Sequence, residues 1–106
     1  MVSAVDHMHQ NGIAHRDIKM GNILLDNNLN VLVTDFGLSR VAYRQSKGGT
    51  VMSNKFCGTM PYMAPEILLT KEYSVEYNPF VADIWALGVV LFCIVNRGYP
   101  FVEGEK

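Results

Sequence analysis

The sequence predicts a mainly α fold with one small antiparallel β-hairpin. Two segments indicate the helical class: an amphipathic stretch at residues 2–9 and a long apolar stretch from Ile84 to Val95. Two short apolar runs, 23–25 and 31–33, lie on either side of a polar turn and indicate the hairpin. The chain has 106 residues, of which 49% are hydrophobic, so we expect at most one globular domain.

The first helix is predicted from the spacing of Val2, Val5, Met8 and His9, which follow one face of a helix. The pair Asn11-Gly12 is expected to end it, with the glycine in a left-handed conformation. The start of the chain has neither a basic region nor a continuous apolar core, so we expect no signal peptide.

The middle of the chain alternates short apolar runs with polar turns. Asp26-Asn27-Asn28 supplies the turn of the hairpin, because these side chains bond readily to nearby backbone groups. From residue 41 to 54 the segment is polar and rich in glycine, which predicts a mobile surface loop.

Two further helices are predicted from their first residues. Pro65 suits the first turn of a short helix that continues to Leu69. Asn78-Pro79 is an N-cap and first-turn pair that opens a helix to about Val95. This helix is apolar nearly all round, so we expect it to be fully buried. Its apolar run is shorter than the roughly 20 residues of a membrane span, so we expect no membrane partner.

Charge and cysteine content limit the classes of function. The net charge is −1 and no basic run occurs, so nucleic-acid binding is not indicated. Cys57 and Cys93 form neither a metal-ligand spacing nor a disulfide framework. Such cysteine usage suggests a reducing setting, so we expect a cytoplasmic, intracellular location.

Three motifs carry the functional information. They are His15-Arg16-Asp17-Ile18-Lys19-Met20-Gly21-Asn22, then Asp35-Phe36-Gly37, then Ala64-Pro65-Glu66, which follows Gly58-Thr59. In this order and spacing they resemble the catalytic loop, magnesium loop and activation segment of eukaryotic serine/threonine protein kinases. The resemblance implies a partial kinase C-lobe. The neighbourhoods of Cys57 and Trp85 resemble the calcium/calmodulin-kinase-like group, and within it the testis-specific serine kinases.

The resemblance implies that three residues act on the transferred phosphoryl group. Asp17 would orient the hydroxyl of a protein Ser or Thr and accept its proton, and Lys19 would place an ammonium on the phosphate. Thr59 would contact both residues, a feature of serine/threonine specificity.

The resemblance also implies ATP and Mg²⁺ as cofactors. Asn22 and Asp35 would ligate the metal through oxygen atoms, which hard cations prefer, and the hairpin would return the chain so that both face one site. Leu24 would form the floor of the adenine pocket, while Lys19 would also contact the nucleotide.

Regulation by an upstream kinase is a further implication. Arg16 next to the catalytic aspartate is typical of kinases that are switched by activation-loop phosphorylation. Lys55 stands where many of these kinases carry the phosphorylated hydroxyl, and Ser53 is the nearest alternative. Ser53 is therefore the predicted switch site, against the alternative of a loop serine without a role.

The remaining implied roles are structural. His15 and Phe36 should stack in the core, and Val90 and Ile94 should support the adenine floor. Asp83 should accept hydrogen bonds from the backbone near His15 and Arg16.

Residues 1–106 are expected to form only part of a kinase domain. They contain no glycine-rich nucleotide loop and no strand of the Val-Ala-Ile-Lys type, so the N-lobe and the C-terminal helices are expected to be absent. Three alternatives remain open: part of a true kinase, a short non-catalytic product that acts as a decoy or binding fragment, or an incomplete sequence. The isolated chain is expected to show no phosphotransfer.

Overall fold

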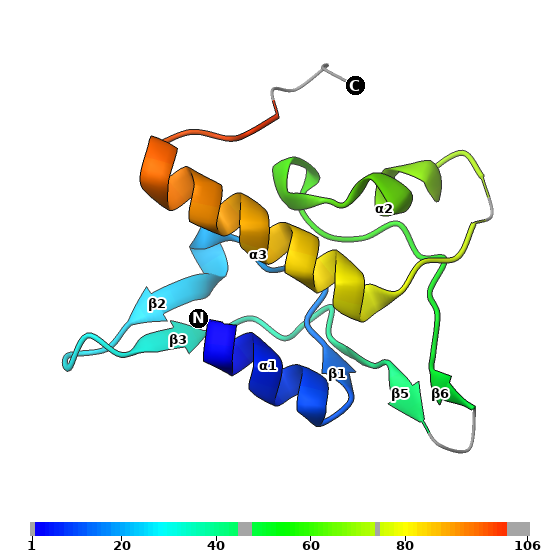
Figure 1. Cartoon of the computed structure of the whole chain (residues 1–106), viewed down its shortest axis with the longest axis horizontal. Helices are drawn as coiled ribbons and strands as arrows, with labels where there is room; N and C mark the ends of the chain where they lie inside the picture. Colours follow the sequence, from blue (N-terminus) through cyan, green and yellow to red (C-terminus); the bar gives the residue numbers. More distant parts are fainter. Residues whose placement is uncertain (1, 45–47, 74, 102–106) are drawn as a thin grey trace.

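A computed structural model describes residues 2–44, 48–73 and 75–101. Helix α3 (Pro79–Asn96) crosses the centre of the molecule, and α1 (Val2–Gln10) and α2 (Pro65–Leu69) lie on either side of it in Figure 1. Three two-stranded antiparallel pairs accompany the helices within the described residues, where the sequence predicted one.

Helix α1 follows the predicted pattern. Val5 and Met8 face the core, whereas Val2 is 59% exposed. The helix ends at Gln10, and Gly12 in the turn that follows has a left-handed φ of +77° as expected and an amide that donates to the His9 carbonyl over 3.0 Å. A side chain here would also crowd Tyr43, because an added Cβ would lie 3.3 Å from its carbonyl oxygen.

The predicted hairpin is confirmed as β2 (Ile23–Leu25) and β3 (Val31–Val33), with Leu24 opposite Leu32. The carboxylate of Asp26 closes the turn by accepting hydrogen bonds from the backbone amides of Asn28 and Asn30 over 2.8 and 2.9 Å. These bonds hold the pKa of Asp26 below its ordinary value.

The segment predicted as a loop, residues 41–54, contains the end of one strand and all of two others, so the prediction of a loop throughout was wrong in part. β1 (Ile13–Ala14) pairs with β4 (Arg40–Val41), and β5 (Tyr43–Arg44) pairs with β6 (Gly49–Thr50). Residues 45–47 of the predicted loop lie outside the described residues. The β1–β4 pair returns the chain to the strand that enters the His-Arg-Asp motif.

Helix α3 begins as predicted. The side chain of Asn78 accepts a hydrogen bond from the Phe80 amide over 2.9 Å, and Pro79 occupies the first turn. The helix ends at Asn96 and is capped by Arg97, which takes a left-handed conformation with φ 55°.

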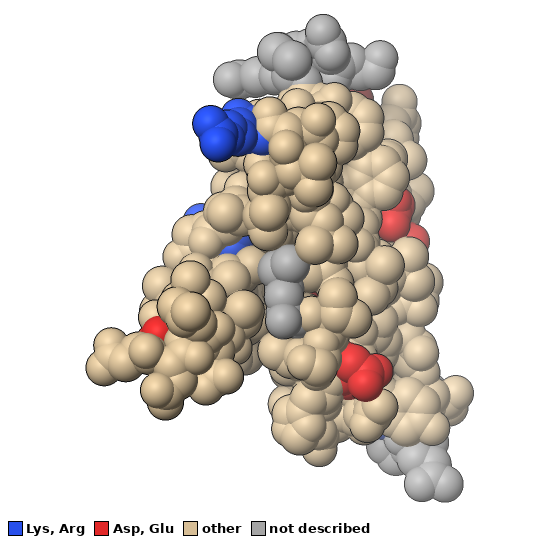
Figure 2. Space-filling model, turned by 60° about the vertical axis from the view of Figure 1, so that its left-hand side comes forward, with Lys and Arg blue, Asp and Glu red and all other residues tan. Residues whose placement is uncertain are grey.

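The expectation that α3 is fully buried was wrong. Only one face is covered, while apolar side chains on the other remain open, including Ile94, which is 53% exposed. Figure 2 brings forward the side where the hairpin and the C-terminal end of α3 lie, and few charged side chains appear on it. The helix has 18 residues and a mean hydropathy of 2.0, so length and composition alone would also suit a membrane span.

The buried face of α3 organises two apolar clusters. One brings α1, the catalytic-loop motif and η3 (Met60–Tyr62) against the helix; its buried members are Val5, Ile18, Tyr62, Ala86, Leu87, Val89 and Val90. The other packs α2 and the segment before α3 against the first turns of the helix; its buried members are Met63, Ala64, Ile67, Tyr77 and Ala82. Trp85 of α3 packs against both clusters, so this one helix supports the catalytic-loop motif on one side and α2 on the other.

Candidate active site

Asp83 fixes the start of the catalytic-loop motif to helix α3. Its carboxylate is 2% exposed and accepts hydrogen bonds from the backbone amides of His15 and Arg16 over 2.8 and 2.9 Å. The Nε2 atom of His9 lies 2.9 Å from the same carboxylate. The predicted backbone contacts of Asp83 are confirmed, and His9 is an additional partner.

The imidazole of His15 joins two motifs. Its Nε2 donates to the Thr34 carbonyl over 2.9 Å, and its Nδ1 accepts the Asp17 amide over 3.1 Å, which fixes a neutral tautomer with the proton on Nε2. The ring is fully buried and lies 5.1 Å from the Phe36 ring, centre to centre. Phe36 is 49% exposed, so the expected core stack is buried on the histidine side alone.

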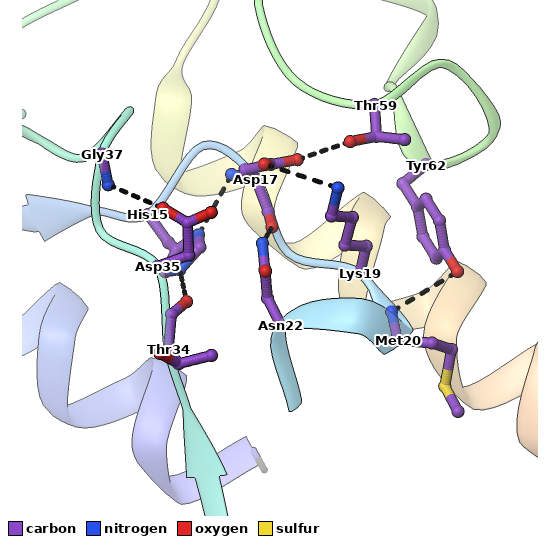
Figure 3. A network of polar contacts seen from close by, with 10 residues as sticks. All are labelled: His15, Asp17, Lys19, Met20, Asn22, Thr34, Asp35, Gly37, Thr59 and Tyr62. Atoms are coloured by element: carbon purple, nitrogen blue, oxygen red, sulfur yellow. Dashed lines mark hydrogen bonds and ion pairs between the residues drawn. The ribbon is translucent and has the colours of Figure 1, made fainter. Parts of the chain in front are cut away.

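Asp17 meets Thr59 and Lys19 (Figure 3). The Thr59 hydroxyl donates to Oδ1 of Asp17 over 2.7 Å, and the Lys19 ammonium lies 3.9 Å from Oδ2. The two side chains of the ion pair are partly exposed, at 13% for Asp17 and 31% for Lys19. The structure thus holds a carboxylate in a defined orientation beside an accessible cation.

Asn22 and Asp35, the two predicted metal ligands, are drawn with this carboxylate in Figure 3. The Nδ2 of Asn22, in η1 (Met20–Asn22), donates to the Asp17 carbonyl over 2.8 Å, so its amide oxygen points elsewhere. Asp35 is exposed, and its Oδ1 accepts the Gly37 amide over 3.3 Å. Leu24, the predicted adenine floor, is 50% exposed on β2.

The backbone is strained at both motifs. Arg16 and Asp35 adopt left-handed φ values of 71° and 58°, which non-glycine residues take rarely. Gly58, next to Thr59, has φ 117°, and an added Cβ would lie 3.2 Å from the Arg16 carbonyl oxygen. A glycine here lets the activation segment approach the catalytic loop closely enough for Thr59 to reach Asp17.

Arg16 connects the catalytic loop to the segments after the second motif. Its Nε donates to the Leu38 carbonyl over 2.7 Å, and its Nη1 lies 3.4 Å from the Ser53 hydroxyl. Its Nη2 is buried and has no hydrogen-bond partner among the described residues. The structure therefore brings together the two predicted regulatory residues, and within the described part of the chain one guanidinium nitrogen has no acceptor.

Tyr62 supports the loop beyond Lys19, a role that sequence reasoning missed. Its hydroxyl accepts the Met20 amide over 3.4 Å, and its ring meets that of Tyr99 edge to face at 5.6 Å. Burial raises the pKa of Tyr62 to about 12. Sequence reasoning also missed the contact of His9 with Asp83. The spacing of apolar residues places His9 on one face of the first helix and gives no sign of a partner.

Comparisons with known proteins show the family of this chain. The model of the protein kinase domain matches residues 1–106. Testis-specific serine/threonine-protein kinase 2 of Mus musculus is 40% identical over 103 residues, which cover 97% of this chain and 28% of that protein. Serine/threonine-protein kinase ppk8 of Schizosaccharomyces pombe is 42% identical over 101 residues, or 95% of this chain and 19% of that protein.

A plant protein gives a similar match. CBL-interacting protein kinase 11 of Oryza sativa subsp. japonica is 43% identical over 101 residues, which cover 95% of this chain and 19% of that protein. The chain thus spans less than a third of the length of each of these curated relatives. The resemblance to testis-specific serine kinases is confirmed, and the match along the whole sequence shows that this chain belongs to the protein kinase family.

Proposed function

We propose that this chain is the catalytic-loop and activation-segment part of a serine/threonine protein kinase C-lobe. The reaction would move the γ-phosphoryl group of ATP to a Ser or Thr hydroxyl of a protein substrate. The observation that carries the proposal is the contact of Thr59 with Asp17 at 2.7 Å, because it joins the activation segment to the residue that would orient the hydroxyl.

Asp17 has the geometry of a group that orients a nucleophile. One carboxylate oxygen is occupied by Thr59, and the other lies 3.9 Å from the Lys19 ammonium. A substrate hydroxyl that donates to this second oxygen would lie close to the ammonium. The ammonium could then stabilise negative charge on the transferred group. In this proposal Asp17 would position the hydroxyl and Lys19 would stabilise the charge of the transferred group.

The donor set fits a magnesium ion shared with substrate phosphates. Asn22 offers an amide oxygen, because its nitrogen is already bonded to the Asp17 carbonyl. Asp35 offers a carboxylate whose bond to Gly37 is long, at 3.3 Å. Mg²⁺ commonly binds to one or two such protein oxygens and completes its shell with phosphate and water. When bound, the ion would neutralise charge on the phosphates.

A chimera tests the proposal. The 106 residues replace the matching segment of the mouse testis-specific kinase 2, and transfer from ATP to a degenerate serine/threonine peptide library is measured. We expect transfer in the chimera and a loss of about 10²–10⁴-fold in the Asp17→Asn variant. The matched control is Asp6→Asn, an exposed carboxylate on α1, which should leave transfer unchanged. A chimera that folds but does not transfer contradicts the proposal.

The isolated 106-residue chain is expected to be inactive. It carries the proposed catalytic residues without the glycine-rich loop and the strand lysine that kinases use to hold ATP. ATP-dependent transfer by the isolated chain, abolished by Asp17→Asn, would show that the domain is more complete than proposed.

We also propose that phosphorylation of Ser53 regulates this site. The Ser53 hydroxyl lies 3.4 Å from Nη1 of Arg16, whose Nη2 has no acceptor among the described residues. A phosphoryl group on Ser53 would bring acceptor oxygens to this guanidinium and order the segment before Thr59. Phosphopeptide mapping of the active chimera should find Ser53 modified, and Ser53→Ala should lower transfer. An unmodified Ser53 in active protein contradicts this proposal.

A further inference from the structure

The segment that leads into α3 lies antiparallel to the activation segment (Figure 1). The Tyr77 amide donates to the Ser53 carbonyl over 2.7 Å, and the Ser53 amide donates to the Tyr77 carbonyl over 2.9 Å. This isolated bridge is the point where residues 24 positions apart exchange two backbone hydrogen bonds. It attaches the activation segment to the residue that precedes the N-cap of the central helix.

The Tyr77 side chain makes a second attachment on the same segment. Its hydroxyl donates to the Lys55 carbonyl over 2.7 Å and lies 3.9 Å from the Cys57 sulfur. The residue is 2% exposed, and its ring belongs to the cluster that includes Met63 and Ile67. Tyr77 thus contacts every second residue of this part of the activation segment, at positions 53, 55 and 57.

The held segment leads directly to the site. Gly58 follows Cys57 and passes beside the Arg16 carbonyl, and Thr59 then donates to Asp17 over 2.7 Å. Upstream, the Ser53 hydroxyl accepts the Lys55 amide over 3.1 Å and lies near Arg16. Displacement of residues 53–57 would therefore disturb both contacts that join this segment to the catalytic loop, namely Ser53 with Arg16 and Thr59 with Asp17.

We infer that Tyr77 is a positioning residue whose hydroxyl and backbone fix residues 53–57 so that Thr59 reaches Asp17. The placement itself follows from the contacts, and its consequence for phosphoryl transfer rests on the proposed function. The hydroxyl contributes a partly buried hydrogen bond to the Lys55 carbonyl, which a phenyl ring of the same shape cannot make.

The test is Tyr77→Phe in the 106-residue chain, read by iodoacetamide labelling of Cys57 with Cys93 as the internal reference. Cys57 is 8% exposed and its sulfur lies 3.9 Å from the tyrosine hydroxyl, and Cys93 is half-buried on α3. We expect Cys57 labelling to rise about three- to tenfold, the effect of losing one hydrogen bond on a local opening. The control is Tyr73→Phe, which is 60% exposed and should leave labelling unchanged. An unchanged Cys57 rate in Tyr77→Phe overturns the inference.

Amide hydrogen exchange separates local positioning from general destabilisation. In Tyr77→Phe, exchange should accelerate at Ser53 and Lys55 while Val89 and Val90 in α3 keep their protection. A uniform acceleration over all these amides would overturn the inference.

If the variant fails to fold, the unaltered chain decides the question. The Ser53 and Tyr77 amides should then show one common opening rate, and free exchange at Ser53 contradicts the inference. None of these measurements requires kinase activity, so a failure of the proposed function remains distinguishable.

Discussion

Replacement of Asp83 with Asn perturbs the junction between the central helix and the catalytic loop. The native carboxylate accepts from the amides of His15 and Arg16 and lies 2.9 Å from the His9 imidazole, and it is 2% exposed. An asparagine of nearly the same shape has one acceptor oxygen and one NH₂ group. That NH₂ group must face at least one of the existing donors.

The magnitude follows from the number of bonds affected. Leaving one buried donor unpaired costs about 1–3 kcal/mol, and hydrogen bonds to a charged group exceed neutral ones by about 1 kcal/mol each. Three donors surround Asp83, so we expect Asp83→Asn to lower the free energy of unfolding by about 3–5 kcal/mol. This is a large part of the about 5–15 kcal/mol that stabilises a typical domain.

Urea unfolding followed by circular dichroism measures this loss. The matched control is Asp6→Asn, whose exposed carboxylate accepts only from Gln10 over 2.9 Å within the described residues, and we expect a change below about 0.5 kcal/mol. A loss below about 1 kcal/mol for Asp83→Asn would refute the reasoning, because the carboxylate would then contribute little to fixing the loop.

Three other predictions concern separate elements of the fold. Asn78→Ala removes the cap on the Phe80 amide and should lower the free energy of unfolding by about 1 kcal/mol in the same assay, whereas no loss would contradict the capping role. Gly58→Ala should cost about 1–3 kcal/mol, because its φ is 117° and the new Cβ would lie 3.2 Å from the Arg16 carbonyl; a neutral substitution would contradict this close approach. Burial raises the pKa of Tyr62 from its ordinary 10.0 to about 12, so the folded chain holds the phenol proton more tightly than the unfolded chain. The resulting stabilisation is complete below pH 10 and is lost as the pH rises towards 12. The urea midpoint of the native chain should therefore fall over this pH range, and the fall should be smaller in Tyr62→Phe.

Local signals predicted the helices and the hairpin. Gly12 and Asn78 mark helix ends through their own conformations and side chains, and Asp26 closes a turn with amides two and four residues away. Such contacts depend on neighbours in the chain, so the sequence displays them directly. The β1–β4 and β5–β6 pairs have strands of two residues, which are too short to show alternation.

Burial and long-range contacts could not be predicted in the same way. The hydropathy of α3 predicted burial all round, but exposure depends on which elements pack against each face, and Ile94 remains 53% exposed. The motifs predicted site roles for Asp17, Asn22 and Asp35, whereas the contact of His9 with Asp83 joins positions 74 residues apart and has no such motif. The left-handed conformation of Asp35 also comes from tertiary context.

The most direct test of the central proposal is phosphoryl transfer by the chimera that carries these 106 residues in the mouse testis-specific kinase 2. Thr59 donates to one oxygen of Asp17 while Lys19 lies 3.9 Å from the other, so the account predicts transfer that Asp17→Asn lowers by about 10²–10⁴-fold. Equal transfer rates in the chimera and in its Asp17→Asn variant would contradict the account.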